Sequence, residues 1–208
     1  MDIDGFWELI ERSGRAAGTK DARLAWMLEE LSGRSPEELI DYQCQWTVVQ
    51  ARGCTMDLYA AHWFVFGSGS LDGFEYFVSW LISLGRESFE KVADCPDLLI
   101  ELPQVLRHLD LKRAYYSSKG VRSRDMQRRL EEEWPEFELL AYVAHEAYER
   151  ITGSGSGALY EAVHERGVFS GFPLIPALGS VPDGEQWDFD DPREFVRRLP
   201  RTARHRGL

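Results

Sequence analysis

The sequence predicts an all-α fold: a multi-helix single domain with an irregular C-terminal extension. Two observations lead to this prediction. Apolar residues recur at spacings of three and four along most of the chain, which is the period of a helix with one buried face. No long segment alternates between apolar and polar residues, as a half-buried strand does. With 44% hydrophobic residues among 208, the chain can form a sizeable core.

Two helices are expected at the N-terminus. Phe6, Leu9 and Ile10 lie three and four residues apart and mark the apolar face of the first. The second would begin at Asp21, acting as its N-cap, and would end at Gly33.

The next helix has the strongest start signal in the sequence. Ser35 can act as the N-cap, Pro36 suits the first helical position, and Glu38 completes a capping box. Thr55 is expected to cap the helix that follows. That helix, MDLYAAHWFVF, is apolar nearly all round, so we expect it to be central and buried.

A glycine-serine run separates this helix from a second apolar segment, which ends at Gly85. Phosphate-binding loops have glycines spaced as GxGxxG or end in GK[ST], and they follow a strand. Gly67, Gly69 and Gly73 fit neither spacing, and no lysine follows. We therefore interpret the run as a joint between two helices, in which Gly67 or Gly69 adopts a positive φ and Ser70 caps the second helix.

Three further helix starts are expected in the second half. Pro96 suits a first turn, Ser123 can cap a basic surface helix, and Pro135 begins a helix with the sequence EFELLAYVAHEAYERI. The helical domain is therefore expected to span residues 1–152.

Residues 153–208 are expected to form a flexible break and a C-terminal arm. The glycine-serine sequence GSGSG opens this part, and residues 168–190 are rich in proline and glycine without a clear period. Asp191 and Pro192 then indicate a cap and first turn for a short helix that ends at Pro200.

Charge is unevenly distributed along the chain. The formal net charge is -11, but residues 193–208 carry six arginines against Glu194 alone, so the rest of the chain is the more acidic. An acidic body repels nucleic-acid phosphates, which makes nucleic acid an unlikely partner except through the arginine-rich tail. We expect the tail to fold back onto the acidic body.

Cysteine usage and hydropathy indicate the compartment. Cys44, Cys54 and Cys95 are odd in number and form no CxxC pair, which is typical of reduced thiols in a cytoplasmic protein. The sequence contains no run of about 18 apolar residues, so no membrane-spanning helix is expected. The acidic start MDIDGFWELIER is unlike a secretory signal. The expected localisation is cytoplasmic, without a membrane partner.

Two small groups of residues could carry chemistry. Asp57, His62 and Asp72 lie around the glycine-serine joint and could form an acid–base cluster; the alternative is that His62 is an ordinary core histidine. His145 and Glu149 are four residues apart and could face one metal ion, but two ligands do not make a site, and an exposed pair is the simpler interpretation. We therefore predict no metal and no cofactor.

Aromatic residues are concentrated around the joint. At helical spacing such residues more often form core than a ligand pocket, so we expect core. The set comprises Trp46, Trp63, Phe64, Phe66, Phe74, Phe77 and Trp80. Near the C-terminus, GEQWDFDD is expected to dock its aromatics while its acids face water.

The run TMDLYAAHWFVFGSGSLDGFEYFVSWLISLGRESFEKVADCPDLL resembles the bacterial family called domain of unknown function 4240. Asp57 matches the family's D-aromatic/Leu-A-A segment, and Trp80 matches its F-x-x-F-x-x-W-L helix. Arg86 and Glu87 match its G-R/K-E. The resemblance covers most of residues 5–110, with patches at LLAYVAHEAYERITG and GEQWDFDD. It implies an α-helical domain with no established activity, and it marks Trp80, Arg86 and Glu87 as binding candidates.

The absence of a catalytic motif and the charge split favour a soluble protein-interaction or regulatory module. The expected partner is a protein of unknown identity. The alternative is a small-molecule or metal-dependent enzyme that uses Asp57, His62 and Asp72.

Overall fold

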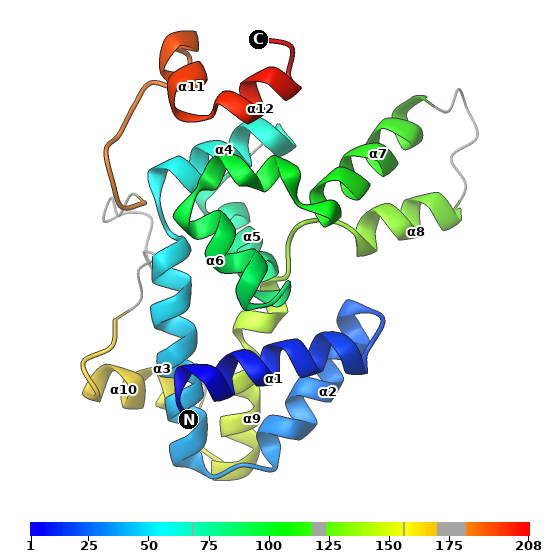
Figure 1. Ribbon diagram of the computed structural model, residues 1–208. Coiled ribbons are helices and arrows are strands. Elements are labelled where there is room, and N and C mark those ends of the chain that lie inside the picture. Colours follow the sequence, from blue (N-terminus) through cyan, green and yellow to red (C-terminus); the bar gives the residue numbers. More distant parts are fainter. Residues whose placement is uncertain (68, 118–123, 156, 170–181) are drawn as a thin grey trace.

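The structure is a computed structural model that describes residues 1–67, 69–117, 124–155, 157–169 and 182–208 (Figure 1). The described chain is all-α, as the sequence predicts. Its one β-type pairing is an isolated bridge between Thr55 and Asp183. None of the described helices is long and apolar enough to cross a membrane.

The elements follow one another with short connections over the first two thirds of the chain. The first six are α1 (Ile3–Ala16), α2 (Lys20–Ser32), α3 (Pro36–Gly53), α4 (Met56–Phe66), α5 (Leu71–Ser83) and α6 (Arg86–Asp94). A 3₁₀ turn and a helical hairpin come next: η1 (Pro96–Glu101), α7 (Pro103–Ser117) and α8 (Arg124–Glu132). The last elements are η2 (Glu138–Ala141), α9 (Val143–Thr152), α10 (Ala158–Glu165), α11 (Pro192–Arg198) and α12 (Pro200–His205).

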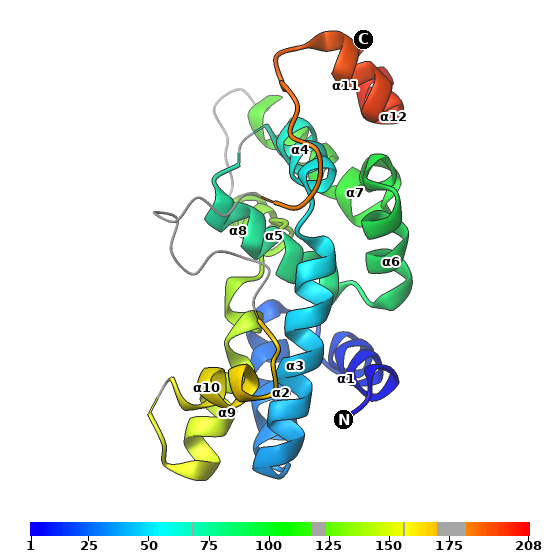
Figure 2. The same cartoon turned by 90° about the vertical axis from the view of Figure 1, so that its left-hand side faces the viewer.

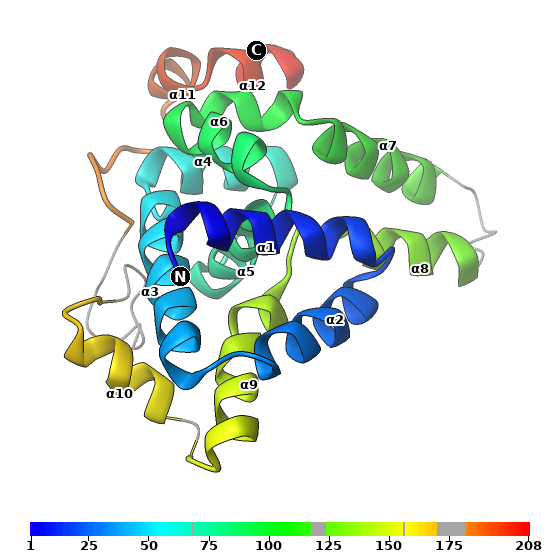
Figure 3. The ribbon, with the colours of Figure 1, turned by 60° about the horizontal axis from the view of Figure 1, so that its bottom comes forward.

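The long helix α3 connects the two ends of the molecule. Figure 1 shows α4, α11 and α12 at one end of it and α2, α9 and α10 at the other. The same grouping holds when the molecule is turned (Figure 2). Helices α7 and α8 pack against each other and extend away from the body (Figure 3).

Local capping signals position most of the helices. Ser35 and Glu38 form the predicted capping box at α3, and Thr55 caps α4 by accepting a hydrogen bond from Leu58 N. The prediction for α2 was wrong by two residues. Thr19, not Asp21, is the N-cap, because Thr19 has the extended backbone that a cap needs and accepts from Ala22 N. Asp21 lies inside the first turn, where its negative charge interacts favourably with the positive end of the helix dipole.

The glycine-serine run is a joint between two helices, as predicted. Helix α4 ends at Gly67, whose φ of 82° lies in the left-handed region, and Gly67 N donates to Trp63 O. Ser70 caps α5 by accepting from Gly73 N. No strand enters this turn, so among the described residues it lacks the strand-loop-helix geometry of a phosphate site.

Aromatic side chains make up much of the core, as expected. Trp46, Phe66, Phe74, Phe77 and Trp80 are buried. The other two residues of the set are less buried: Trp63 is exposed and Phe64 is partly buried. Their rings contact Phe189 and Phe195 of the C-terminal segment.

Two helices predicted in the second half of the chain differ from the observed elements. The helix expected from Pro135 is divided into η2 and α9, because Phe137 N donates to Tyr76 O on α5 at 2.9 Å and leaves the helical path. The short helix expected to end at Pro200 ends at Arg198, and Pro200 instead begins α12. The candidate cap Ser123 lies outside the described residues.

Residues 183–208, here called the terminal arm, lie on the body around α4 and η1. Met56 N donates to Asp183 O at 2.7 Å, and the rings of Phe64 and Phe195 stack with centroids 3.9 Å apart. Arg201 pairs with Glu101 on η1 at 2.8 Å. The expectation that the basic tail folds back is therefore confirmed. Contact of the tail with nucleic acid stays a prediction.

The turn between α5 and α6 needs a glycine. Gly85 has φ 95° and ψ 169°, a region that other residues rarely occupy, and a β-carbon there would lie 3.3 Å from Glu11 Cγ. We expect Gly85→Ala to lower the free energy of unfolding by about 2 kcal/mol. Gly18→Ala is the control, because a β-carbon there meets nothing within 4 Å. Equal stability of the two variants in denaturant unfolding would contradict this prediction.

Candidate functional site

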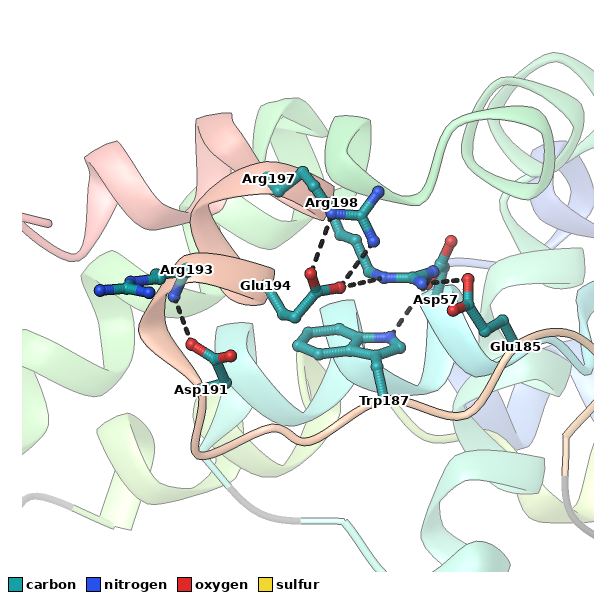
Figure 4. Close-up of polar contacts among 8 residues, drawn as sticks. All are labelled: Asp57, Glu185, Trp187, Asp191, Arg193, Glu194, Arg197 and Arg198. Atoms are coloured by element: carbon teal, nitrogen blue, oxygen red, sulfur yellow. Dashed lines mark hydrogen bonds and ion pairs between the residues drawn. The ribbon is translucent and has the colours of Figure 1, made fainter.

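Asp57 lies in the first turn of α4 and binds the terminal arm (Figure 4). Its Oδ1 accepts hydrogen bonds from Trp187 Nε1 at 3.1 Å and from Arg198 Nη1 at 3.2 Å. Arg198 also bonds to Glu185 and to Glu194, and these acids raise the pKa of its guanidinium. The carboxylate of Asp57 therefore acts in this structure as an anchor for the arm.

His62 is buried in the aromatic core between α4 and α5. Its side chain is 3% exposed, and its ring lies 4.6 Å from that of Phe77. No described residue forms a hydrogen bond with its Nδ1. Burial lowers the pKa of His62 to about 4, so the ring is neutral at pH 7.

Asp72 lies in the first turn of α5 with its side chain exposed to solvent. Within the described chain, no hydrogen bond or ion pair joins any two of Asp57, His62 and Asp72. The structure therefore places the three predicted catalytic candidates in different environments: an ion-pair network, the core and the surface.

Of the three binding candidates marked by the family resemblance, Trp80 lies on α5, and Arg86 and Glu87 lie in the first turn of α6. Trp80 is buried against Phe77. Arg86 bonds to Glu90 at 2.9 Å and to Asp4 on α1 at 2.7 Å, which joins the two helices. Glu87 is exposed in the first turn of α6. A binding role for these residues stays a prediction.

A cavity of about 680 Å³ lies at the other end of the molecule, between α2, α3, α9 and α10. Figure 3 shows these helices grouped around the N-terminal half of α3. Most of the wall is apolar, with Leu24 and Leu28 from α2, Val143 from α9 and Val163 from α10. The wall thus combines α2 and α10, which lie more than 120 residues apart in the sequence.

Polar side chains from α3, α5 and α9 interrupt this apolar wall. Gln50 Nε2 donates to Glu75 Oε1 at 3.4 Å. Burial raises the pKa of Glu75, and repulsion from Asp72 adds to the effect. Gln43 also lines the cavity and is 8% exposed, and its Oε1 has no hydrogen-bond partner among the residues that the structure describes. An unmet buried acceptor is costly, so this amide is a group that a ligand can satisfy.

His145 and Glu149, the candidate metal ligands, also line the cavity. No group of three or more His, Cys, Asp or Glu residues is arranged to hold a metal ion in the described part of the chain. The two residues therefore form part of the cavity wall on α9.

A family model that matches most of the chain shows which family the protein belongs to. The family model described as "Protein of unknown function (DUF4240)" matches residues 1–150 of 208. The chain belongs to the DUF4240 family. The resemblance inferred from the sequence is thus confirmed. No curated protein and no solved structure matches this DUF4240 protein.

The cavity of this DUF4240 protein was missed by sequence reasoning. The part contributed by α2, α3, α5 and α9 lies within the matched region, whereas α10 lies beyond it. One signal was present: Gln43 and Gln50 are seven residues apart, so they share a helix face with the buried Trp46. Two glutamines on the buried face of a helix require polar partners, which indicates a polar cavity or a buried network.

Proposed function

We propose that this DUF4240 protein is a cytoplasmic regulatory module that binds a small molecule in the cavity between α2, α3, α9 and α10. The observation that supports this function is the cavity itself. Small-molecule sites typically enclose about 300–1,000 Å³ and have apolar walls with a few polar groups, and the volume of about 680 Å³ lies in that range. The two polar groups needed to orient a ligand are Glu75 and Gln43.

Catalysis has less support than binding. A general acid or base must reach the substrate and must exchange a proton near the working pH. Asp57 bonds to the terminal arm, and His62 is buried with a pKa of about 4. The protein partner inferred from the charge split stays a prediction.

Blocking the cavity tests the proposed function. Ala25 is exposed on α2 and lines the cavity, so Ala25→Trp places an indole over it with little effect on the core. We expect wild-type protein to bind the neutral fluorescent probe N-phenyl-naphthylamine with one-to-one stoichiometry, and we expect Ala25→Trp to weaken that binding at least tenfold. The measurement is fluorescence titration.

Ala22→Trp is the matched control for this test. Ala22 is exposed on the same helix but does not line the cavity, so the probe should bind this variant as it binds wild type. Equal binding by all three proteins, or no binding by wild type, would contradict the proposed function.

A further inference from the structure

We propose that the ligand is an organic cation with an apolar body, and that its charged head lies against Glu75. This inference rests on the proposed function and adds the chemical class of the ligand. It depends on the sign of the charges in the cavity wall, on an unmet hydrogen-bonding group, and on the aromatic rings beside them.

The charges that line the cavity are of one sign. Glu75, Glu146 and Glu149 contribute carboxylates, and the described lining residues include no lysine or arginine. His145 is the one lining residue that can become positively charged. Phosphate and carboxylate ligands need positive or N–H-rich surroundings, which this wall lacks. Glu75 and Glu149 are partly buried, so they attract a cation more strongly than carboxylates in bulk water do, whereas Glu146 is exposed.

Glu75 is the carboxylate best placed to select a cation. It is partly buried on α5 and accepts a hydrogen bond from Gln50 Nε2. Asp72 and Glu138 are close enough to raise its pKa further. A carboxylate held in this environment is stabilised when a positive group approaches, because the cation offsets both the burial and the repulsion.

Gln43 provides an independent sign that the cavity is built for a ligand. It is more than nine-tenths buried, and its Oε1 has no hydrogen-bond partner within the described parts of the chain. It lies two helical turns from Gln50 on α3, about 10 Å along the helix axis. A ligand with a cationic head at Glu75 and a second donor at the far end satisfies both groups.

Aromatic rings complete the recognition of a cation. Tyr142, which is 49% exposed, is the lining aromatic residue open to a ligand, whereas Trp46 also lines the cavity but is 1% exposed and packs against Phe6 and Tyr42. Cations bind well over the faces of tryptophan and tyrosine rings, and the apolar wall accommodates the remainder of the ligand.

Three probes that share a naphthyl body and differ in charge test the inference: naphthylethylamine, naphthylethanol and naphthylpropionate. By isothermal titration calorimetry at pH 7, we expect the amine to bind at least tenfold more tightly than the alcohol and the propionate to bind most weakly. Equal affinities would overturn the cation inference and leave the cavity's binding function standing. No binding of any probe would overturn both.

Glu75→Gln removes the proposed charge and keeps the shape. We expect this variant to bind the amine about tenfold more weakly and the alcohol unchanged. Glu161→Gln is the control, because Glu161 is exposed on α10, does not line the cavity and gives the same change in net charge. If Glu75→Gln weakens the amine and the alcohol alike, Glu75 has a structural role and the inference is wrong.

Tyr142→Leu gives a second variant in case Glu75→Gln fails to fold. Tyr142 is 49% exposed, so its replacement leaves the core intact. We expect it to reduce the preference for the amine over the alcohol several-fold, because a cation–π contact is lost. An unchanged preference in this variant would count against the aromatic part of the site.

Discussion

Replacing Asp97 by alanine is expected to detach the terminal arm and to lower the free energy of unfolding by about 3 kcal/mol. The carboxylate of Asp97 is 3% exposed. It accepts hydrogen bonds from Arg201 N at 2.8 Å and from Thr202 N at 2.9 Å, so it caps the start of α12 from η1. It also accepts from Thr202 Oγ1 at 3.0 Å. Its removal leaves two buried donors and one partly buried donor without this acceptor.

Denaturant unfolding measures the change in stability, and trypsin digestion reports release of the arm at its arginines. Glu101→Ala is the control, because the ion pair between Glu101 and Arg201 is exposed and should contribute less than about 1 kcal/mol. If Asp97→Ala leaves the arm as resistant to trypsin as wild type, the anchoring role of Asp97 is wrong.

Lowering the pH from about 6.5 to 4 is expected to destabilise the folded protein through His62. Burial lowers the pKa of this histidine from 6.5 to about 4, so between these values the unfolded chain binds a proton that the folded chain does not. Stability therefore rises with pH across this window and is fully present above the unfolded pKa. The total effect of this one group is about 3 kcal/mol.

His62→Leu tests the assignment by removing the titrating ring and keeping an apolar side chain of similar size. Denaturant unfolding at pH 7, 6 and 5 should show a shallower pH dependence for this variant than for wild type. His108 is also buried with a lowered pKa, so part of the slope should remain. His205→Leu is the control at an exposed position. An unchanged slope in His62→Leu would contradict the assignment.

Local signals account for the parts of the fold that were predicted correctly. Each of these signals joins residues three or four positions apart: Ser35 and Glu38 in the capping box, Gly67 N and Trp63 O at the end of α4, and Ser70 and Gly73 N at the start of α5. The error at Asp21 has the same local origin, since Thr19 and Asp21 both carry cap-forming side chains and only the backbone conformation separates them.

The candidate site was outside the reach of such signals. The catalytic hypothesis grouped Asp57, His62 and Asp72 because they are near one another in sequence, but burial and the terminal arm place them in different surroundings. The sequence could not predict the cavity, because its walls come from helices that lie more than 100 residues apart. Only the buried glutamines of α3 indicated that polar atoms needed partners there.

The sequence by itself determined an all-α chain, its principal helix starts and the glycine joint, because these depend on propensity, caps and periodicity over a few residues. The tertiary structure decided the rest. Asp97 caps a helix that begins about 100 residues later, Arg198 reaches Asp57 across the chain, and four helices enclose a cavity beside Glu75. Such contacts depend on how helices pack, and packing brings together side chains whose pairing no local pattern encodes.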